Sequence, residues 1–314
     1  MRRLGLKIFV FALLVVAVVT FILERFGGYI DYFYVKVTTP VQTSLILGDS
    51  RPMQGIQPSI INECMPNSGF ELPMYNFAFT GVQGLYGPPY FKSIRKKLDP
   101  NTKNGLFIIG VSPAQLSVSP DDDERNHIFS EANQPPHNMK FINMRPNFEY
   151  FFRNYRFFHF NALFRGKSQT HTDGWLEQNV FFSPSERAFK KKQRIQGVVE
   201  NFKNLKPSTY RLQSLDSLIS FLSRRGKVVL VRLPMDAEPV AIEDRYWPQF
   251  NSKMSELAVA NGIKYFNFTQ KNTFDMYDGA HLGNKSGALF TRVLCDSIRK
   301  SLPNPNQNKN VHAQ

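Results

Sequence analysis

Two short stretches far apart in the chain carry residues that can do nucleophilic chemistry together. An apolar run breaks into Gly48-Asp49-Ser50, which predicts a buried strand that delivers a serine at its carboxyl end. Much later, Asp278 stands three residues before His281. A hydroxyl, a base that takes its proton and an acid that orients the base make up a serine nucleophile system. The sequence therefore favours an acyl-transferring enzyme with Ser50 as nucleophile, His281 as base and Asp278 as the orienting acid.

The rest of the chain contains the short elements that must position these groups. The predicted strands are Thr43–Leu47, Met74–Phe79, Gly105–Val111, Lys227–Leu233 and Ile263–Phe268, and the predicted helices are residues 85–97, 209–224, 246–261 and 285–301. This alternation predicts an α/β fold, a three-layer α/β/α sandwich with a mostly parallel five-stranded sheet. Ser50 is then expected at the carboxyl edge of the sheet, where open parallel sheets place their ligand sites.

The residues that flank the two motifs are expected to form loops at that edge. Residues 51–55 are predicted as a loop or short turn, with a helix following near Pro58–Cys64. Asp49 is expected to cap this turn by accepting backbone N–H groups. About one turn separates Asp278 from His281, so the carboxylate can hold one ring N–H and leave the other nitrogen free for the serine proton.

An apolar stretch near the N-terminus predicts a membrane anchor. Residues 8–23 contain no charged side chain, and Arg2, Arg3 and Lys7 precede them. Spanning helices need about 17–25 residues, and their basic flank stays in the cytoplasm. A cleaved signal peptide is the alternative, but no small-x-small cleavage pattern follows. We expect an uncleaved signal anchor with one pass through a bacterial-type inner (cytoplasmic) membrane, a cytoplasmic N-terminus and a periplasmic or extracellular catalytic domain.

These signals divide the chain into segments. The segments are a cytoplasmic stub and anchor (1–26), a juxtamembrane connector (27–40), an α/β domain (41–302) and a disordered tail (303–314). A helical insertion at about 120–205 interrupts the domain, and aromatic and arginine residues interleave between Phe148 and Arg165. These residues either pack on the sheet domain or form a membrane-facing or substrate-gripping lid, and packing is favoured.

Composition limits the partners and cofactors. The formal net charge is +14, but the basic residues are scattered and accompany no nucleic-acid motif. An anionic lipid surface or glycan explains the same charge, so no nucleic acid is expected as a partner. Cys64 and Cys295 lack metal-ligand spacing, and the sequence leaves open whether they pair. The remaining histidines also lack ligand spacing, so neither a metal nor an organic cofactor is expected.

The two motifs resemble those of the SGNH/GDSL hydrolase superfamily, and especially its membrane-anchored envelope members, the DltD-like proteins and the AlgX-like polysaccharide O-acetyltransferases. The resemblance rests on Leu-Gly-Asp-Ser at 47–50 and on Asp278-Gly-Ala-His281-Leu, with Gly287 and Thr291 downstream. It covers residues 40–118 and 225–302 and leaves out the insertion. It implies a flavodoxin-like sheet and a serine esterase or O-acyltransferase that modifies cell-envelope polysaccharide.

The resemblance also implies an oxyanion hole. The second block of the superfamily supplies a glycine N–H, and the stretch from Asn76 to Gly81 looks like that block, which nominates Gly81 beside the Ser50 N–H. The third block usually has an asparagine two residues after a glycine. Here Gly110 is followed by Ser112 in that place, so Ser112 replaces the asparagine and Asn76 is a candidate substitute. One oxyanion donor contributes about 10²–10³ in rate, so this departure bears on turnover.

Two further side chains are candidate substrate contacts. Arg232 ends a predicted strand, where it either holds an anionic sugar or acyl carrier or pairs with a structural carboxylate. Trp175 either stacks on a sugar ring or packs against the protein, and packing is favoured. A multi-span acyltransferase that supplies the acyl group is a candidate partner. The alternative function is a non-catalytic, membrane-tethered scaffold or polymer-binding protein on a degenerate SGNH fold.

Overall fold

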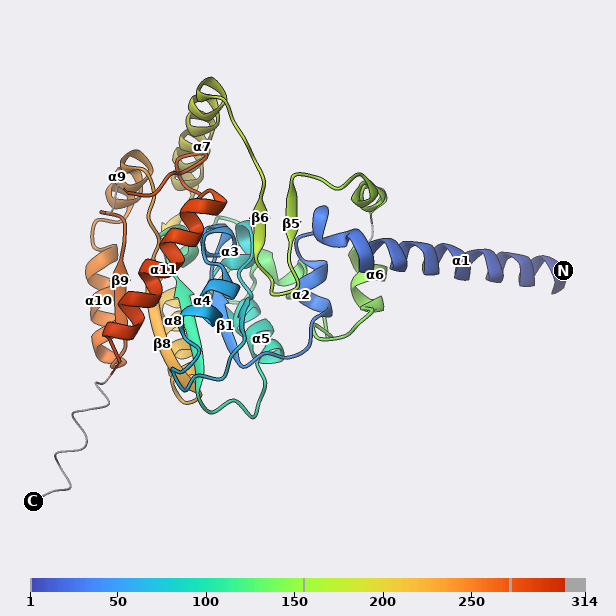
Figure 1. The fold of residues 1–314 in the computed structure, drawn as a ribbon, viewed down its shortest axis with the longest axis horizontal. Helices are drawn as coiled ribbons and strands as arrows, with labels where there is room; N and C mark the ends of the chain where they lie inside the picture. Colours follow the sequence, from blue (N-terminus) through green and yellow to red (C-terminus); the bar gives the residue numbers. More distant parts are fainter. Residues whose placement is uncertain (1, 155, 271–272, 303–314) are drawn as a thin grey trace, which may run out of the picture.

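A five-stranded parallel sheet forms the centre of the molecule (Figure 1). The computed structural model describes residues 2–154, 156–270 and 273–302, so the predicted tail at 303–314 lies outside the described residues. The strands are β1 (Ser44–Leu47), β2 (Met74–Asn76), β3 (Gly105–Gly110), β8 (Gly226–Arg232) and β9 (Lys264–Asn267). Their order is β2-β1-β3-β8-β9, and every neighbouring pair is parallel. The predicted fold class is confirmed, and each strand overlaps the run that predicted it.

Helices cover both faces of the sheet. One face carries α5 (Pro88–Lys97), α8 (Thr209–Ser223) and α10 (Phe250–Ala260), and the other carries α4 (Pro58–Cys64) and α11 (Asn284–Lys300). Successive side chains of a strand point to opposite faces, so Leu45 and Leu47 of β1 join the first core and Ile46 joins the second. Because β1 lies between β2 and β3, the carboxyl ends of β1 and β3 form the crevice where such sheets bind ligands.

The other elements surround this core. They are α1 (Arg2–Phe26), α2 (Tyr34–Thr38), α3 (Ser50–Gly55), α6 (Phe148–Asn154), α7 (Pro184–Asn204), α9 (Ala237–Tyr246), and two short antiparallel pairs, β4 (Ser117–Val118) with β7 (Lys206–Pro207) and β5 (Ser168–Thr170) with β6 (Leu176–Gln178). The insertion between β3 and β8 does not form one compact helical unit. Its α6 and a 3₁₀ helix, Phe157–Phe164, lie beside α1, whereas α7 lies at the far side of the β5–β6 pair (Figure 1).

Two helical regions differ from the sequence prediction. Residues 51–55, predicted as a loop, belong to α3, because the Asp49 carboxylate caps the helix by accepting the Arg51 N–H at 3.0 Å. The predicted helix at 246–261 is divided between the ends of α9 and α10. Proline disfavours the helical conformation of the residue before it, and Pro248 follows Trp247 at this break.

Two buried lysines fasten the segment after α1 to the sheet. Lys36 of α2 donates to the carbonyl oxygens of Asn76 at 2.5 Å and Gly174 at 2.6 Å. Lys97 at the end of α5 donates to the carbonyl oxygens of Lys36 at 2.9 Å and Thr39 at 2.7 Å. Burial lowers the pKa of both amines, and it lowers the pKa of Lys97 to about 7. These bonds hold the connector, and with it the base of α1, in a fixed place on the domain.

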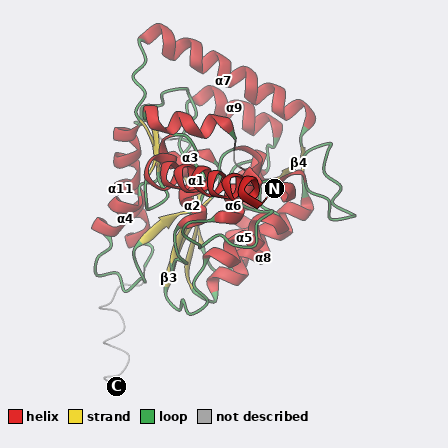
Figure 2. Ribbon diagram, turned by 90° about the vertical axis from the view of Figure 1, so that its right-hand side faces the viewer, coloured by secondary structure: helices red, strands yellow, loops and turns green. Residues whose placement is uncertain are grey.

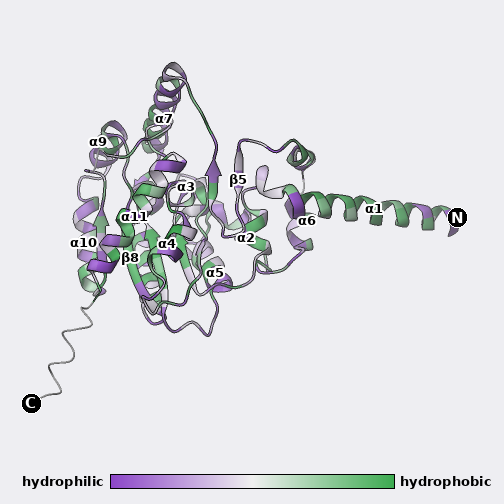
Figure 3. Ribbon diagram, in the orientation of Figure 1, coloured by the Kyte–Doolittle hydropathy of each residue, from purple (hydrophilic) through white to green (hydrophobic). Residues whose placement is uncertain are grey.

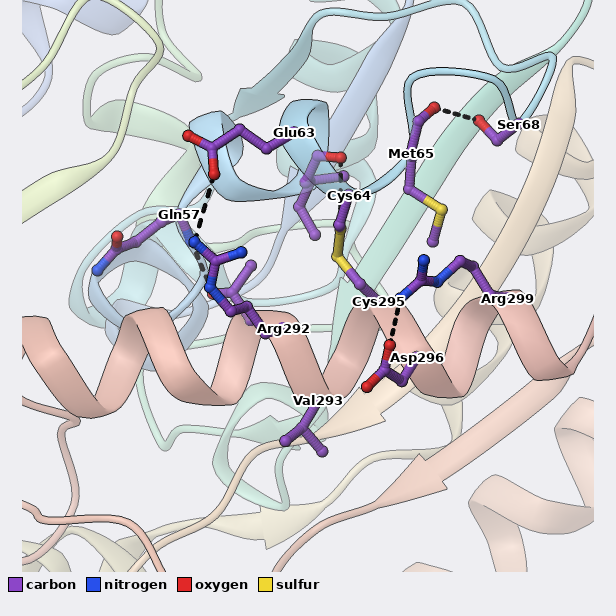
Figure 4. Close-up of a disulfide and its surroundings, with 12 residues drawn as sticks. Gln57, Glu63, Cys64, Met65, Ser68, Arg292, Val293, Cys295, Asp296 and Arg299 are labelled. Atoms are coloured by element: carbon purple, nitrogen blue, oxygen red, sulfur yellow. Dashed lines mark hydrogen bonds and ion pairs between the residues drawn. A yellow bond between two sulfur atoms is a disulfide. The ribbon is translucent and has the colours of Figure 1, made fainter.

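The two cysteines form a disulfide that joins α4 to α11 (Figure 4). Their Cα atoms lie 6.4 Å apart, and the bond links positions separated by 231 residues. An ion pair between Glu63 and Arg292, at 3.3 Å, joins the same two helices beside it. Because α4 follows the Ser50 segment and α11 follows His281, the disulfide ties the two halves of the chain that carry the motifs.

Loss of this disulfide is expected to destabilise the fold. Replacing Cys64 and Cys295 together by serine should lower the free energy of unfolding by about 2–5 kcal/mol, because the unfolded chain gains freedom. Chemical unfolding of the full-length protein in detergent measures the difference. A reductant should destabilise the wild type by a similar amount and leave the double variant unchanged. Equal stability of the oxidised wild type and the variant would contradict a closed disulfide.

Candidate active site

A turn that only glycine fits delivers Ser50 to the carboxyl edge of the sheet. Gly48 has a φ of +135°, and a Cβ atom there would lie 2.7 Å from Cγ of Pro52 and 3.0 Å from the carbonyl oxygen of Gly110. Asp49 then caps α3, and Ser50 is the first residue of that helix. The hydroxyl therefore stands next to the end of β3, in the crevice that the strand order creates.

Three predicted residues, Ser50, His281 and Asp278, are joined by hydrogen bonds. Ser50 Oγ lies 2.8 Å from His281 Nε2. On the other side of the ring, His281 Nδ1 lies 2.9 Å from Asp278 Oδ2. A proton on Nδ1 satisfies the carboxylate and leaves the Nε2 lone pair to accept the serine proton. The arrangement is that of a nucleophile, a base and an orienting acid.

Asp278 also shapes the loop that presents His281. Its Oδ1 atom accepts the backbone N–H groups of Ala280 at 3.1 Å and His281 at 2.9 Å. Burial by itself would raise the pKa of Asp278, but the hydrogen bond and charge of His281 and the charge of Arg194 together hold it well below its usual range. The group is therefore a carboxylate at neutral pH and can stabilise an imidazolium.

A row of cations on α7 faces the carboxylates around this loop. Arg187 pairs with Asp275 at 2.9 Å, Lys191 with Asp236 at 2.6 Å, and Arg194 with Asp278 at 3.0 Å. Spacings of three and four residues place these cations on one helix face. None of the residues of α7, all of which the structure describes, is buried. These ion pairs link the helix to the loop, and the Phe202 ring of α7 also stacks on the Tyr246 ring of α9, with centroids 4.2 Å apart. The more exposed pairs contribute only about 0.2–1 kcal/mol each.

A cavity of about 720 Å³ opens at Ser50 and His281. Ser50, His281 and Arg194 contribute polar groups to its lining. Much of the remaining wall is apolar, and it includes Val82, Leu85, Val198, Phe202, Leu205 and Met235. Several of these side chains come from α7 and the residue after it, so α7 forms one wall of the space in which a substrate would meet the serine.

Two residues that line this cavity have backbone N–H groups without a hydrogen-bond acceptor among the described residues. Neither the Ser50 N–H nor the Gly81 N–H donates a hydrogen bond within the described part of the chain, and both residues line the cavity. Gly81 is brought close because Gly84 packs on the turn after β1, where a Cβ atom at Gly84 would lie 2.8 Å from the Gly48 carbonyl oxygen. Backbone N–H donors without other acceptors, in residues that line the same cavity as the nucleophile, could bind the oxyanion of a tetrahedral intermediate.

The two side chains predicted as further oxyanion donors have other partners. Asn76 Nδ2 donates to the carbonyl oxygens of Pro52 at 2.9 Å and Ile56 at 3.1 Å. Ser112 Oγ donates to Asp49 Oδ2 at 3.2 Å. Both side chains are fully buried, and neither is among the described residues that line the cavity. The structure corrects the prediction that these side chains are oxyanion donors. Asn76 instead binds carbonyl groups of α3 and of the residue after it, and Ser112 binds the Asp49 carboxylate that caps α3.

For both candidate substrate contacts, the structure shows the structural alternative. Arg232 is fully buried, and it donates to Glu243 and Asp244, each at 2.9 Å, which is the structural alternative considered above. Trp175 donates its indole N–H to the Gln54 carbonyl oxygen at 2.8 Å and packs at the end of α3. Neither side chain is among the described residues of the cavity wall.

Sequence reasoning missed three neighbours of the site. Arg194 contacts the orienting acid, and the Tyr277 ring stacks on the His281 ring with centroids 5.8 Å apart. Arg51 lines the cavity and pairs with Asp49 at 2.9 Å. A capping box and the basic spacing of residues 183–194 are the signals that could have revealed α7. Among the described residues, no group of three or more His, Cys, Asp or Glu side chains is placed to hold a metal ion.

Comparison with known proteins gives weak likenesses. No protein-family model matches the chain, and no curated protein matches its sequence. Among solved structures, it is similar to the lipase/acylhydrolase from Enterococcus faecalis (12% identity, TM-score 0.38, 83% of this chain and 98% of that chain). It is also similar to a carbohydrate acetylesterase family member from Sinorhizobium meliloti, with 10% identity and a TM-score of 0.37 over 83% of this chain and 98% of that chain. A third similar structure is the aryl esterase of M. smegmatis, with 10% identity and a TM-score of 0.38 over 82% of this chain and 98% of that chain. Likenesses at this level carry no argument about its chemistry, which has to be judged from its own residues.

A serine-directed fluorophosphonate is expected to label the full-length protein at Ser50, because His281 can take the proton as the oxygen attacks phosphorus. Ser50→Ala should abolish the labelling, and His281→Ala should slow it by about 10²–10⁴-fold. Gel fluorescence and peptide mass spectrometry locate and time the adduct.

Ser252→Ala is a matched control, because Ser252 is exposed on α10 and its hydroxyl donates to the Gln249 carbonyl oxygen at 2.8 Å. This control should label at the wild-type rate. Undiminished labelling of the Ser50→Ala variant would show that the reactive serine lies elsewhere.

Proposed function

We propose that this chain is a membrane-anchored serine acyl-transfer enzyme of the SGNH kind. It would act as an O-acyltransferase or esterase on cell-envelope polysaccharide, through an acyl group carried on Ser50. The observation that carries the proposal is the hydrogen-bonded chain from Ser50 through His281 to Asp278, which opens into a cavity lined also by Gly81. Residues arranged in this way suit nucleophilic attack on an ester carbonyl.

The first half of the proposed reaction loads the serine. Ser50 Oγ bonds to the ester carbonyl carbon while its proton passes to His281 Nε2, and Asp278 stabilises the imidazolium. The carbonyl oxygen becomes an oxyanion that accepts from the N–H groups of Ser50 and Gly81. The carbon–oxygen bond to the leaving alcohol then breaks, and His281 returns the proton to that alcohol. The acyl group remains on Ser50.

The second half repeats these steps with an acceptor. His281 removes a proton from the acceptor hydroxyl, and the acceptor oxygen bonds to the acyl carbon. The bond to Ser50 Oγ breaks, and the proton returns to the serine. A water acceptor makes the enzyme an esterase, whereas a sugar hydroxyl makes it an O-acyltransferase. A multi-span acyltransferase of the same membrane is the partner we propose as the source of acyl groups.

Two observations support placement at the cell envelope. α1 is long and apolar enough to cross a membrane, and Figure 3 shows it hydrophobic along most of its length. Its last turns are part of the fold, because Val19, Ile22 and Leu23 are buried, and this favours an anchor that stays attached. The net charge of +14 favours contact with an anionic lipid surface or an anionic glycan. These features resemble the DltD-like and AlgX-like arrangement.

One observation favours the alternative, a non-catalytic scaffold or polymer-binding protein. Ser112 stands where the superfamily usually has a donor asparagine, and its hydroxyl is turned toward Asp49 instead of the cavity. The oxyanion would then depend on backbone donors alone. A degenerate site of this kind would keep the fold without turnover.

Hydrolysis of p-nitrophenyl acetate by the full-length protein in detergent separates the two functions. The full chain is needed because α1 contributes buried residues to the core. Ser50→Ala and His281→Ala are each expected to lower kcat/KM by about 10³-fold or more, and Ser252→Ala should leave it unchanged.

A second arm adds oligosaccharide acceptors. Acetylated acceptor would identify a transferase, and release of acetate alone would identify an esterase. A folded wild type that neither turns over the ester nor forms a serine adduct would decide for the scaffold.

A further inference from the structure

The face from which α1 emerges carries a group of exposed apolar side chains. We propose that this group, the root patch (Phe148, Phe152, Leu163 and Phe164), lies in the interfacial layer of an anionic phospholipid bilayer and fixes how the domain sits on the membrane. The proposal rests on the part of the proposed function that makes α1 a membrane anchor. It goes beyond that function because it assigns a lipid-binding surface to residues outside α1.

The surroundings of α1 change near residue 19. The first half of the helix is exposed, whereas Val19 and Leu23 belong to the core of the domain. Glu24 follows, and its carboxylate accepts from Arg145 at 2.5 Å and from the Tyr34 hydroxyl at 2.7 Å. Ion pairs of this kind belong outside the hydrocarbon layer. The membrane boundary therefore falls on the few residues before Glu24.

α6 and the 3₁₀ helix Phe157–Phe164 flank this boundary. Asp31, shortly after α1, accepts from the Tyr150 hydroxyl of α6 at 2.5 Å and pairs with His159 of the 3₁₀ helix at 2.8 Å. The 3₁₀ helix also packs directly on α1. Figures 1 and 2 both place α6 beside the root of α1, and Figure 2 looks along α1 onto this face. A bilayer that surrounds α1 would meet these two elements first.

The side chains of the root patch are turned out of the core. Their exposed fractions are 42% for Phe148, 75% for Phe152, 49% for Leu163 and 84% for Phe164. In contrast, Tyr150 of the same helix α6 is buried. Large apolar side chains gathered on one face mark an interaction surface. Phenylalanine and leucine are the residues that interfacial segments bury at the boundary between headgroups and acyl chains.

Charge next to the root patch favours an anionic bilayer over a neutral protein partner. Two acids beside the root patch are already paired with arginines, Glu24 with Arg145 and Glu149 with Arg153. Arg165, which follows the 3₁₀ helix, is exposed and forms no ion pair within the described residues; its guanidinium lies over the Phe26 ring, 5.5 Å from the centroid. Exposed arginine beside apolar side chains suits phosphate headgroups.

Bilayer contact at the root patch has a consequence for the active site. A single helix anchor alone would let the domain tilt about its connector, but here Lys36 and Lys97 fasten that connector to the sheet. Contact through α6 and the 3₁₀ helix would add further fixed points around α1. The cavity at the carboxyl edge would then keep one orientation relative to the membrane surface.

Tryptophan reporters in the full-length protein test this contact. Phe152→Trp and Phe164→Trp are introduced separately, and Val259→Trp is the control, because Val259 is 81% exposed on α10, at the end of the domain opposite α1 (Figure 1). Each variant is reconstituted in phosphatidylcholine–phosphatidylglycerol vesicles with and without bromine-labelled acyl chains. Flotation after an alkaline wash reports whether α1 is integrated. Difference spectra against the wild type remove the signal of the two native tryptophans.

The proposal predicts flotation, a blue-shifted emission and bromine quenching for F152W and F164W, with an unshifted, unquenched signal for V259W. Flotation without quenching of F152W and F164W would overturn the root patch and leave the anchor standing. A blue shift without bromine quenching would also overturn it, because a protein surface would then cover the patch. Loss from the floated fraction would overturn both the anchor and the patch, while the esterase assay would still test the active site separately.

Discussion

The hydrogen bond between Ser50 Oγ and His281 Nε2 joins residues 231 positions apart, and most of the fold serves to hold its two ends together. At one end, the tight turn at Gly48 places Ser50 at the start of α3, directly after β1. At the other, the His281 loop runs into α11, which packs against α3 and α4. The Gln57 N–H donates to Thr291 Oγ1 at 3.1 Å, and the disulfide joins α4 to α11. Such a bond weakens steeply with distance and angle, so every one of these contacts bears on it.

Local patterns were enough to predict the sheet and the residues that meet at its edge. Buried strands appear as apolar runs, and their carboxyl ends converge in any open parallel sheet, so Ser50 and its partners could be expected there. The oxyanion roles predicted for Asn76 and Ser112 were wrong, because each side chain binds a partner that only the fold brings near. For Arg232 the sequence left two roles open, and the fold supplies the carboxylate partner of the structural one. α7 was missed for a related reason. It carries no buried apolar stripe, and its ion pairs and its contact with α9 involve residues that lie far away in the sequence.

The last turns of α1 belong to the folded core, so no flexible linker joins the helix to the domain. Val19 and Leu23 belong to the buried core of the domain, and the buried amine of Lys36 binds the connector to β2 at the edge of the sheet. The amine of Lys97 binds the connector from α5. A domain joined to its anchor in this way transmits the orientation of the helix to the sheet. If α1 spans a membrane as proposed, the fold sets the position of Ser50 relative to that membrane.

The central claim is that Ser50 carries the acyl group, and acid quenching during turnover tests it most directly. Full-length protein would be mixed with p-nitrophenyl acetate, quenched in acid within the first turnovers, digested and examined by peptide mass spectrometry. The account predicts an acetyl group on the peptide that contains Ser50, which is lost with time as it passes to water or to an added acceptor. Turnover that leaves Ser50 unmodified at every time point, or an acetyl group that accumulates on another residue, would contradict it.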